Sequence, residues 1–348
     1  MSEDKRIPGL DGLRAFSILL VIVHHLLFVT TPSGDHRSLF PAGGQGVTIF
    51  FVISGFLITH LLCEEEKRNG GISLRGFYFR RAFRILPPAM LYLLLTAGFS
   101  SRTDLLNSLF FIRNFFPYGA ANGHFWSLSV EEQFYLFWPA IFILLRSNRV
   151  RLFCLAAVVA VLPFVRQFAG HILGDQPRTL RGYPVPHAAA VVIFILAMGQ
   201  LPVLCGCLLA VARQHVRSRL RFATHPLAIY AYIALAAVLL SRDMSWCATI
   251  LMFVLIVNWA VSQKRSFLDW KPLVWIGVLS YSLYLWQQIF CLQSPLPIVG
   301  RFPLNVVASF AAAALSYYFV ERPALRLRDR LKRQIRTLAM DRPAVVPR

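Results

Sequence analysis

The chain has 348 residues, of which 57% are hydrophobic and only 15% are charged. Its mean hydropathy is +0.57, which is more apolar than one or two soluble cores require. The 36 lysines and arginines outnumber the 16 aspartates and glutamates, for a formal net charge of +20. This composition excludes an ordinary soluble domain and favours an integral membrane protein.

The charged residues cluster, and the apolar runs between them approach the roughly 20 residues that a helix needs to cross a bilayer. A lone segment in lipid satisfies its backbone only as a helix, so the chain is predicted to be an all-α integral membrane protein with about ten transmembrane helices. No removable signal peptide is expected before the first run. The expected spans are 13–29, 47–63, 86–101, 126–145, 152–166, 188–212, 225–241, 245–262, 272–292 and 302–320.

The basic residues orient these helices. With a cytoplasmic N-terminus, 28 of the 36 lysines and arginines fall in cytoplasmic segments, as the positive-inside rule requires. Both termini are therefore expected in the cytoplasm, with one transmembrane domain over residues 1–321 and a basic tail over 322–348 on the inner membrane surface. The positive charge then reflects orientation and contact with membrane lipid, and it indicates no nucleic-acid partner.

The six cysteines lie in or at the ends of apolar runs, at spacings that suggest neither a metal site nor a disulfide framework. No metal is expected. The 188–212 run contains Pro202 and Gly206, which predict a kink or a break there. The sequence gives no indication of the oligomeric state.

A few polar side chains fall at membrane depth, where a charge costs on the order of 2.5–3.5 kcal/mol and is a candidate for function. Asn258 is interpreted as a helix-packing hydrogen bonder, and Gln287 and Gln288 fit packing or function equally. The remaining candidates are His24, His25, Glu131 and Glu132.

His25 and Glu131 form the sharpest pair among these residues. Each lies a few residues from the expected outer end of its helix, so the two are predicted to sit at similar depth. A carboxylate beside an imidazole orients it as a general base, although a structural ion pair between two helices would give the same pattern.

Three arginines, Arg80, Arg81 and Arg84, precede the third expected span. Arg81 and Arg84 are spaced i, i+3 and share a helix face, and guanidinium groups bind phosphate bidentately. Ordinary positive flanking of a membrane helix is the competing explanation.

Six sequence blocks, taken in order, resemble the signature of membrane acyltransferase family 3. They cover nearly the whole chain, which makes the resemblance far more specific than any one block. The blocks are Ile7–Ala15 followed by His25, Gly46–Ile58, Arg80–Pro87, Trp126–Tyr135, Ser280–Trp286 and Phe319–Pro323.

The resemblance implies a multi-pass enzyme of the bacterial inner (plasma) membrane. Such an enzyme moves an acyl group, usually acetyl, from cytoplasmic acyl-CoA to a hydroxyl of a cell-surface glycan or a similar acceptor. The family's catalytic histidine and glutamate fall on His25 and Glu131, and its arginine pair falls on Arg81 and Arg84. Residues 1–321 are then the acyltransferase domain, without a fused SGNH domain, and acetyl-CoA is the expected donor.

In this interpretation Arg80, Arg81, Arg84 and Arg14 hold the coenzyme's phosphates while its pantetheine arm reaches towards His25. Arg14 and His25 are eleven residues apart, roughly 16 Å at helical rise. His25 is then either a general base or an acyl carrier. Gln287 stands where many relatives have histidine, and Thr48 where many have aspartate, which leaves the acceptor unidentified.

A proton-coupled secondary transporter is the alternative function. In it, His25 and Glu131 would form a proton relay. No inverted repeat is visible, however, and the arginine cluster would have no role.

Overall fold

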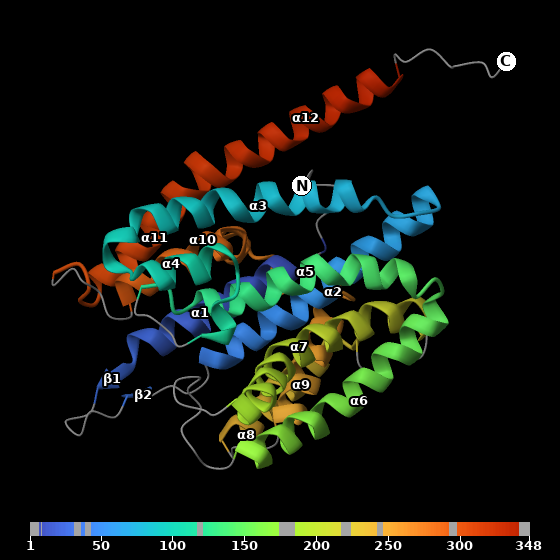
Figure 1. The fold of residues 1–348 in the computed structure, drawn as a ribbon, viewed down its shortest axis with the longest axis horizontal. Helices are drawn as coiled ribbons and strands as arrows, with labels where there is room; N and C mark the ends of the chain where they lie inside the picture. The colour runs from blue at the N-terminus through green and yellow to red at the C-terminus, as the bar shows by residue number, and fades with distance from the viewer. Residues whose placement is uncertain are drawn as a thin grey trace.

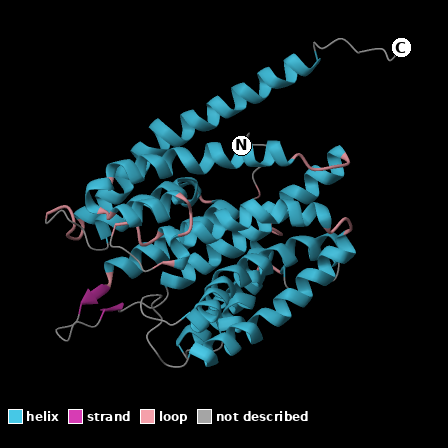
Figure 2. Cartoon of the chain, viewed as in Figure 1, coloured by secondary structure: helices cyan, strands magenta, loops and turns pink. Residues whose placement is uncertain are grey.

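The computed structural model describes residues 7, 9–30, 36–38, 43–116, 121–173, 185–216, 224–241, 246–291 and 298–340, nearly all of them helical (Figure 2). The helices are α1 (Leu10–Leu26), α2 (Gly43–Asn69), α3 (Leu74–Leu95), α4 (Arg102–Leu109), α5 (Phe125–Leu144), α6 (Asn148–Leu173), α7 (Val185–Val216), α8 (Ala228–Ser241), α9 (Trp246–Ala260), α10 (Lys271–Cys291), α11 (Leu304–Ser316) and α12 (Arg322–Met340). One-turn 3₁₀ elements are η2 (Ala97–Phe99), η3 (Arg113–Phe115) and η5 (Phe267–Asp269), and η6 (Tyr317–Glu321) is a π-helix between α11 and α12.

The fold departs from the predicted all-α class at one place. Strands β1 (Phe28–Thr30) and β2 (His36–Ser38) pair antiparallel directly after α1. Phe28, Val29 and Thr30 are aromatic or β-branched residues that suit a strand, and they lie beyond the end of the helix. The hairpin is small, and the rest of the described chain is helical.

A helix overlaps each of the expected spans. Helices α8 and α9 are apolar but short. Among the residues that the structure describes, four helical segments are long and apolar enough to cross a membrane by length and composition: Gly44–Asn69, Asn148–Val165, Lys271–Cys291 and Leu304–Gln334. The structure is thus that of a helical protein suited to a membrane.

Helix α3 begins earlier than the sequence predicted. The side chain of Ser73 accepts a hydrogen bond from the backbone N–H of Gly76 at 3.1 Å and caps the helix. The arginines that were expected to precede the helix therefore lie inside it. Of the kink or break predicted at Pro202 and Gly206, the break does not occur, because α7 is continuous from Val185 to Val216.

Glycines allow the central helices to pack backbone against backbone. A Cβ at Gly277 of α10 would collide with the backbone of Asp11 in α1. Gly55 of α2 and Gly206 of α7 each lie against the other helix's backbone in the same way. Such small-residue contacts are how helices associate where no hydrophobic effect drives them together. This packing fixes α1 between α2 and α10.

The contacts also fix the relative directions of helices. Asp11 lies against Gly277, and His25 lies against Gln287, so α1 and α10 run parallel. Ser54 contacts Glu131, and Thr59 contacts Trp138, so α2 and α5 run parallel as well.

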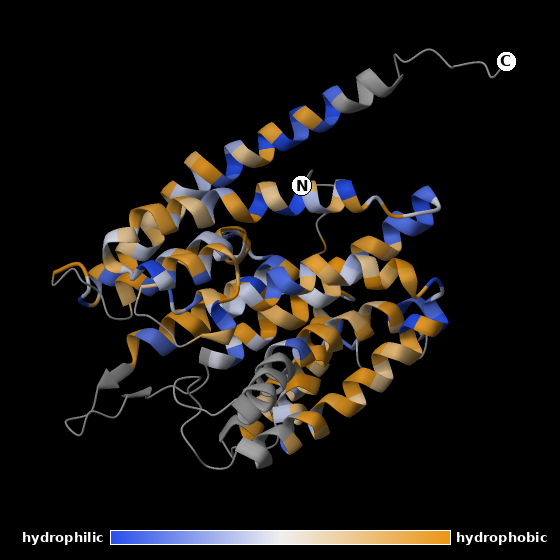
Figure 3. Ribbon diagram, viewed as in Figure 1, coloured by the Kyte–Doolittle hydropathy of each residue, from blue (hydrophilic) through white to orange (hydrophobic). Residues whose placement is uncertain are grey.

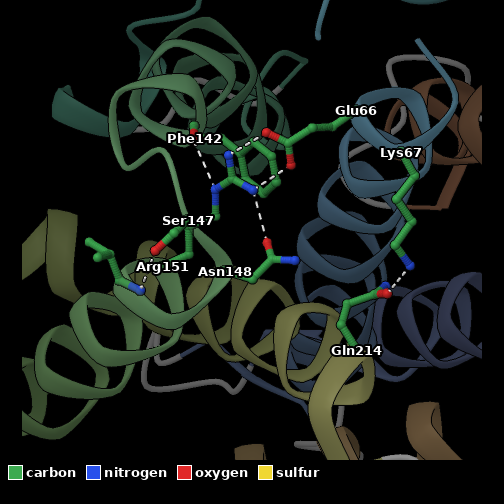
Figure 4. Close-up of polar contacts among 8 residues, drawn as sticks. Glu66, Lys67, Phe142, Ser147, Asn148, Arg151 and Gln214 are labelled. Atoms are coloured by element: carbon green, nitrogen blue, oxygen red, sulfur yellow. Dashed lines mark hydrogen bonds and ion pairs between the residues drawn. The ribbon is translucent and has the colours of Figure 1, made fainter. Parts of the chain in front are cut away.

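A buried arginine ties α2, α5 and α6 together at their ends (Figure 4). The Arg151 guanidinium is 1% exposed and donates to both carboxylate oxygens of Glu66, at 2.6 and 2.8 Å. It also donates to the Phe142 carbonyl at 3.0 Å and to Asn148 at 2.8 Å. Removing one partner from such a buried pair typically costs about 3–5 kcal/mol, so this cluster holds the helix ends in register.

The outer faces of the bundle are apolar. Phe153 and Phe164 of α6 are 76% and 72% exposed, and the whole helix is predominantly hydrophobic (Figure 3). Helix α12, by contrast, alternates apolar and polar residues and lies alongside α3 at the edge of the molecule (Figures 1 and 3). An apolar exterior of this extent is typical of a surface that faces lipid.

Candidate active site

A pocket lies among α1, α2, α3, α5 and α10. Its apolar wall includes Val47, Phe50 and Phe51 of α2. Its polar lining consists of Arg14, Ser54, Arg81, Arg84, Ser127, Glu131, Tyr135, Ser280, Tyr281 and Tyr284. Three of the four arginines that the sequence predicted to bind a donor therefore share one pocket.

Two helices supply these three arginines, which together define the arginine end of the pocket. Arg14 of α1 lies 3.3 Å from the carboxylate of Asp11. The Arg81 guanidinium lies over the ring of Tyr135, 4.9 Å from its centroid. Arg84 follows Arg81 by three residues and lines the same pocket, as i, i+3 spacing on α3 dictates.

The side chain of Arg80 points away from the pocket. Its guanidinium lies 2.7 Å from the carboxylate of Glu65 on α2, and it does not line the pocket. Adjacent residues on a helix point about 100° apart, so Arg80 and Arg81 cannot both face one cleft. The structure separates Arg80 from the group of arginines with which the sequence placed it.

Glu131 lies inside the pocket with the arginines. Its Oε1 accepts a hydrogen bond from Ser54 at 2.8 Å, and its Oε2 accepts one from the Tyr135 hydroxyl at 3.3 Å. Arg14 and Arg81 lie within its electrostatic range. The carboxylate is therefore part of the arginine end.

His25 does not line this pocket; it lies outside the pocket, in the last turn of α1. Its Nδ1 is 2.5 Å from Oε1 of Gln287, a fully buried residue of α10. The Gln287 side-chain NH₂ donates to the Tyr284 carbonyl at 3.5 Å, which turns its oxygen towards the histidine. Because that oxygen only accepts hydrogen bonds, it holds the proton on Nδ1 and leaves Nε2 with a lone pair. We call His25 and Gln287 the histidine end.

The structure does not place Glu131 beside His25. Glu131 contacts Ser54 and Tyr135, whereas His25 contacts Gln287. The similar depth predicted for His25 and Glu131 required α1 to continue to residue 29, but the helix ends at Leu26. Glu131 lies six residues into α5, about 9 Å along that helix at 1.5 Å per residue. Gln287, for which packing and function were left open, occupies the place beside His25.

Sequence reasoning assigned no role to Ser127 and Tyr284, which form a polar wall of the pocket. Ser127 Oγ lies 2.5 Å from the Tyr284 hydroxyl, which also lies 3.2 Å from the carbonyl of His124. The Tyr284 carbonyl contacts Gln287, so this wall connects the pocket to the histidine end. Both residues fall within the sequence blocks of the family resemblance, which was the signal that could have found them.

Within the described ranges, no group of three or more histidine, cysteine, aspartate or glutamate side chains is placed to hold a metal ion. The pocket instead offers three guanidinium groups, and its hydroxyl wall leads through Tyr284 and Gln287 to the imidazole of His25 outside the pocket. That arrangement suits a long anionic molecule whose reactive group lies far from its charge.

Comparison with known families decides the classification, since the model of the family described as an acyltransferase domain matches residues 7–321. The chain belongs to this acyltransferase family. The resemblance that the six sequence blocks indicated is thus confirmed, and residues 7–321 form an acyltransferase domain of this family.

Two relatives illustrate the similarity. The chain is 29% identical to the peptidoglycan O-acetyltransferase OatA of Listeria monocytogenes, across 92% of this chain and 56% of that protein. It is 27% identical to the O-acetyltransferase OatA of Staphylococcus aureus, across 93% of this chain and 58% of that protein. The chain therefore spans a little over half the length of these relatives. No solved structure matches it significantly.

Proposed function

We propose that this acyltransferase moves an acetyl group from cytoplasmic acetyl-CoA to a hydroxyl of a cell-wall glycan across the bacterial inner (plasma) membrane. The observation that carries the proposal is a pocket with three arginines and a hydroxyl wall that Gln287 connects to His25. The acetyl group and the glycan acceptor follow from the relatives, which are named as O-acetyltransferases, one of them of peptidoglycan.

The proposed topology has ten membrane spans and both termini in the cytoplasm. The parallel course of α1 with α10, and of α2 with α5, supports it, because each pair occupies spans of the same parity. The split of basic residues supports the same orientation. The arginine end then faces the cytoplasm, and the histidine end faces the acceptor.

Arg14, Arg81 and Arg84 are proposed to bind the coenzyme's phosphates. A guanidinium fork matches a phosphate bidentately, and partial burial strengthens the interaction. Glu131 limits the mutual repulsion of the three cations when no donor is bound. Arg80 contributes only from the rim, where Glu65 already engages it.

At the histidine end, Nε2 of His25 is proposed to accept the proton of the acceptor hydroxyl. The hydroxyl oxygen attacks the thioester carbonyl carbon, the carbon–sulfur bond breaks, and the coenzyme leaves as a thiolate that takes up the proton. Gln287 holds the imidazole in the tautomer this step requires. Acyl transfer through Nε2 itself would use the same atom.

The transporter alternative relied on direct proton exchange between His25 and Glu131. Gln287 occupies the position beside His25 and cannot titrate, and Glu131 is hydrogen-bonded to Ser54 and Tyr135. No observation therefore favours that function.

The test uses the purified protein in lipid nanodiscs with radiolabelled acetyl-CoA. We expect saturable binding that unlabelled CoA displaces, and release of CoA thiol when peptidoglycan fragments are added. Absence of acetyl-CoA binding would contradict the proposed donor, and binding without transfer to any glycan hydroxyl would contradict the proposed acceptor.

A further inference from the structure

Three buried side chains next to the pocket contain nitrogen atoms with no hydrogen-bond partner among the described residues. They are Nδ2 of Asn122, both ring nitrogens of His124, and Nε1 of Trp286. These residues are only 1%, 4% and 8% exposed. Leaving a buried polar group unsatisfied costs about 1–3 kcal/mol, so three together point to a bound group that satisfies them.

Two of the three residues pack against one aromatic ring. The centroid of the Tyr92 ring lies 5.1 Å from that of His124 and 5.3 Å from that of Trp286. Asn122 lies close by, because Thr96, the residue after α3, contacts its amide oxygen at 3.5 Å. The Tyr92 hydroxyl donates to the Ala121 carbonyl at 2.6 Å and bonds none of the unpaired nitrogens. We call Asn122, His124 and Trp286 the donor cluster.

The donor cluster lies between the pocket and the histidine end. On the pocket side, the His124 ring is 5.6 Å from the ring of Tyr284, which forms the hydroxyl wall. On the other side, His25 lies within electrostatic range of His124. A thioester that reaches from the pocket towards His25 therefore passes this cluster.

The chemistry of the cluster selects the group it would bind. Indole N–H and amide NH₂ groups only donate hydrogen bonds, so they match an oxygen that only accepts them. A thioester carbonyl oxygen is such an acceptor, and it becomes an oxyanion when the carbonyl is attacked. Donors preorganised in apolar surroundings stabilise that charge more than water does.

We propose that Trp286 and Asn122 form the oxyanion site of the acyl-transfer reaction. The acceptor oxygen attacks the carbonyl carbon, and the carbonyl π electrons move onto the oxygen, where the two N–H groups hold the negative charge. The C=O bond then re-forms as the carbon–sulfur bond breaks, and the acceptor's proton passes by way of His25 to the departing thiolate. This inference rests on the proposed function, because it requires a coenzyme A thioester as donor.

The experiment compares two unreactive coenzyme A analogues in nanodiscs. One is a ketone, with a methylene group between sulfur and carbonyl, and the other is a propyl thioether without the carbonyl oxygen. Wild type should bind the ketone more tightly. Trp286→Phe, which removes the N–H and keeps an aromatic ring, should lose this preference, and its turnover at saturating acetyl-CoA should fall about 10²–10³-fold.

Asn122→Ala should also lose the ketone preference and the turnover. A loss in both variants cannot be explained by altered packing at Trp286 alone. Trp138→Phe is the matched control, because the Trp138 N–H already donates to Thr59 at 2.9 Å away from the cluster. It should keep the ketone preference and the turnover.

If Trp286→Phe and Asn122→Ala both keep the wild-type preference and turnover, the cluster binds only water and the inference is wrong. If wild type binds neither analogue nor acetyl-CoA, the proposed donor itself is wrong, and the inference falls with it. These two failures are distinguished by the wild-type measurement alone.

Discussion

The arginine end of the pocket and the histidine end that lies beyond its hydroxyl wall differ in the kind of interaction they offer. The arginine end gathers charges, with Arg14, Arg81 and Arg84 around Glu131. The histidine end relies on neutral hydrogen bonds, of which the contact of His25 with Gln287 is the clearest. The difference indicates a division of labour, in which charge binds the donor and neutral groups orient the reacting atoms.

Replacement of His25 should have the largest effect on transfer. His25→Ala removes the proposed base, and we expect transfer to fall by about 10²–10⁴-fold while acetyl-CoA still binds. His24→Ala is the control, because adjacent helical residues point about 100° apart, and it should retain substantial activity. The assay is CoA release by the two purified variants, and an inactive His24→Ala beside an active His25→Ala would reverse the assignment.

Replacement of Gln287 should have the second-largest effect on transfer, because Gln287 acts through His25. Gln287→Leu removes the oxygen that holds the proton on Nδ1, and we expect kcat to fall about 10–100-fold, the range seen when an orienting partner of a histidine is lost. Gln287→Glu keeps an acceptor and should restore most of the activity. The neighbouring change Gln288→Leu measures the packing cost, and an equal loss in both leucine variants would make Gln287 a packing residue.

Replacement of arginines at the arginine end should weaken the affinity for acetyl-CoA. Arg81→Ala combined with Arg84→Ala should weaken acetyl-CoA binding about 10–100-fold, since a hydrogen bond to a charged group contributes about 1.5–3 kcal/mol. Lysine at both positions should restore only part of the acetyl-CoA affinity, because lysine lacks the planar fork of a guanidinium group. Arg80→Ala is matched in charge and position, and it should change the dissociation constant little.

Titration calorimetry with CoA measures all three arginine variants. If Arg80→Ala weakened binding as much as the double variant did, the pocket would not be the donor site, and the positive-flanking explanation of these arginines would return.

Much of the fold could be predicted from the sequence, because apolar runs and basic flanks are local signals. The sharing of one pocket by Arg81 and Arg84 followed from their i, i+3 spacing. The contact of His25 with Gln287 could not be predicted from the sequence, because it depends on the register of α1 against α10. That register is set by the contact between Gly277 and the Asp11 backbone.

The hydroxyl wall of Ser127 and Tyr284 was missed for a similar reason, because apolar helices with polar residues on several sides carry little record of the face they turn to their neighbours. The separation of Arg80 from Arg81 was missed because these arginines were expected to precede the helix, where the 100° step does not apply. The early start of α3 could have been anticipated from Ser73, a favourable N-cap residue.

The donor is proposed to enter at the arginine end and the acceptor to be modified at the histidine end, on opposite sides of the membrane. Proteoliposomes with one defined orientation test this, with acetyl-CoA and peptidoglycan fragments supplied on the same side or on opposite sides. We predict transfer only when acetyl-CoA is on the side of the chain termini and the fragments are on the other. Transfer with both substrates on one side, at the rate seen across the membrane, would contradict the account.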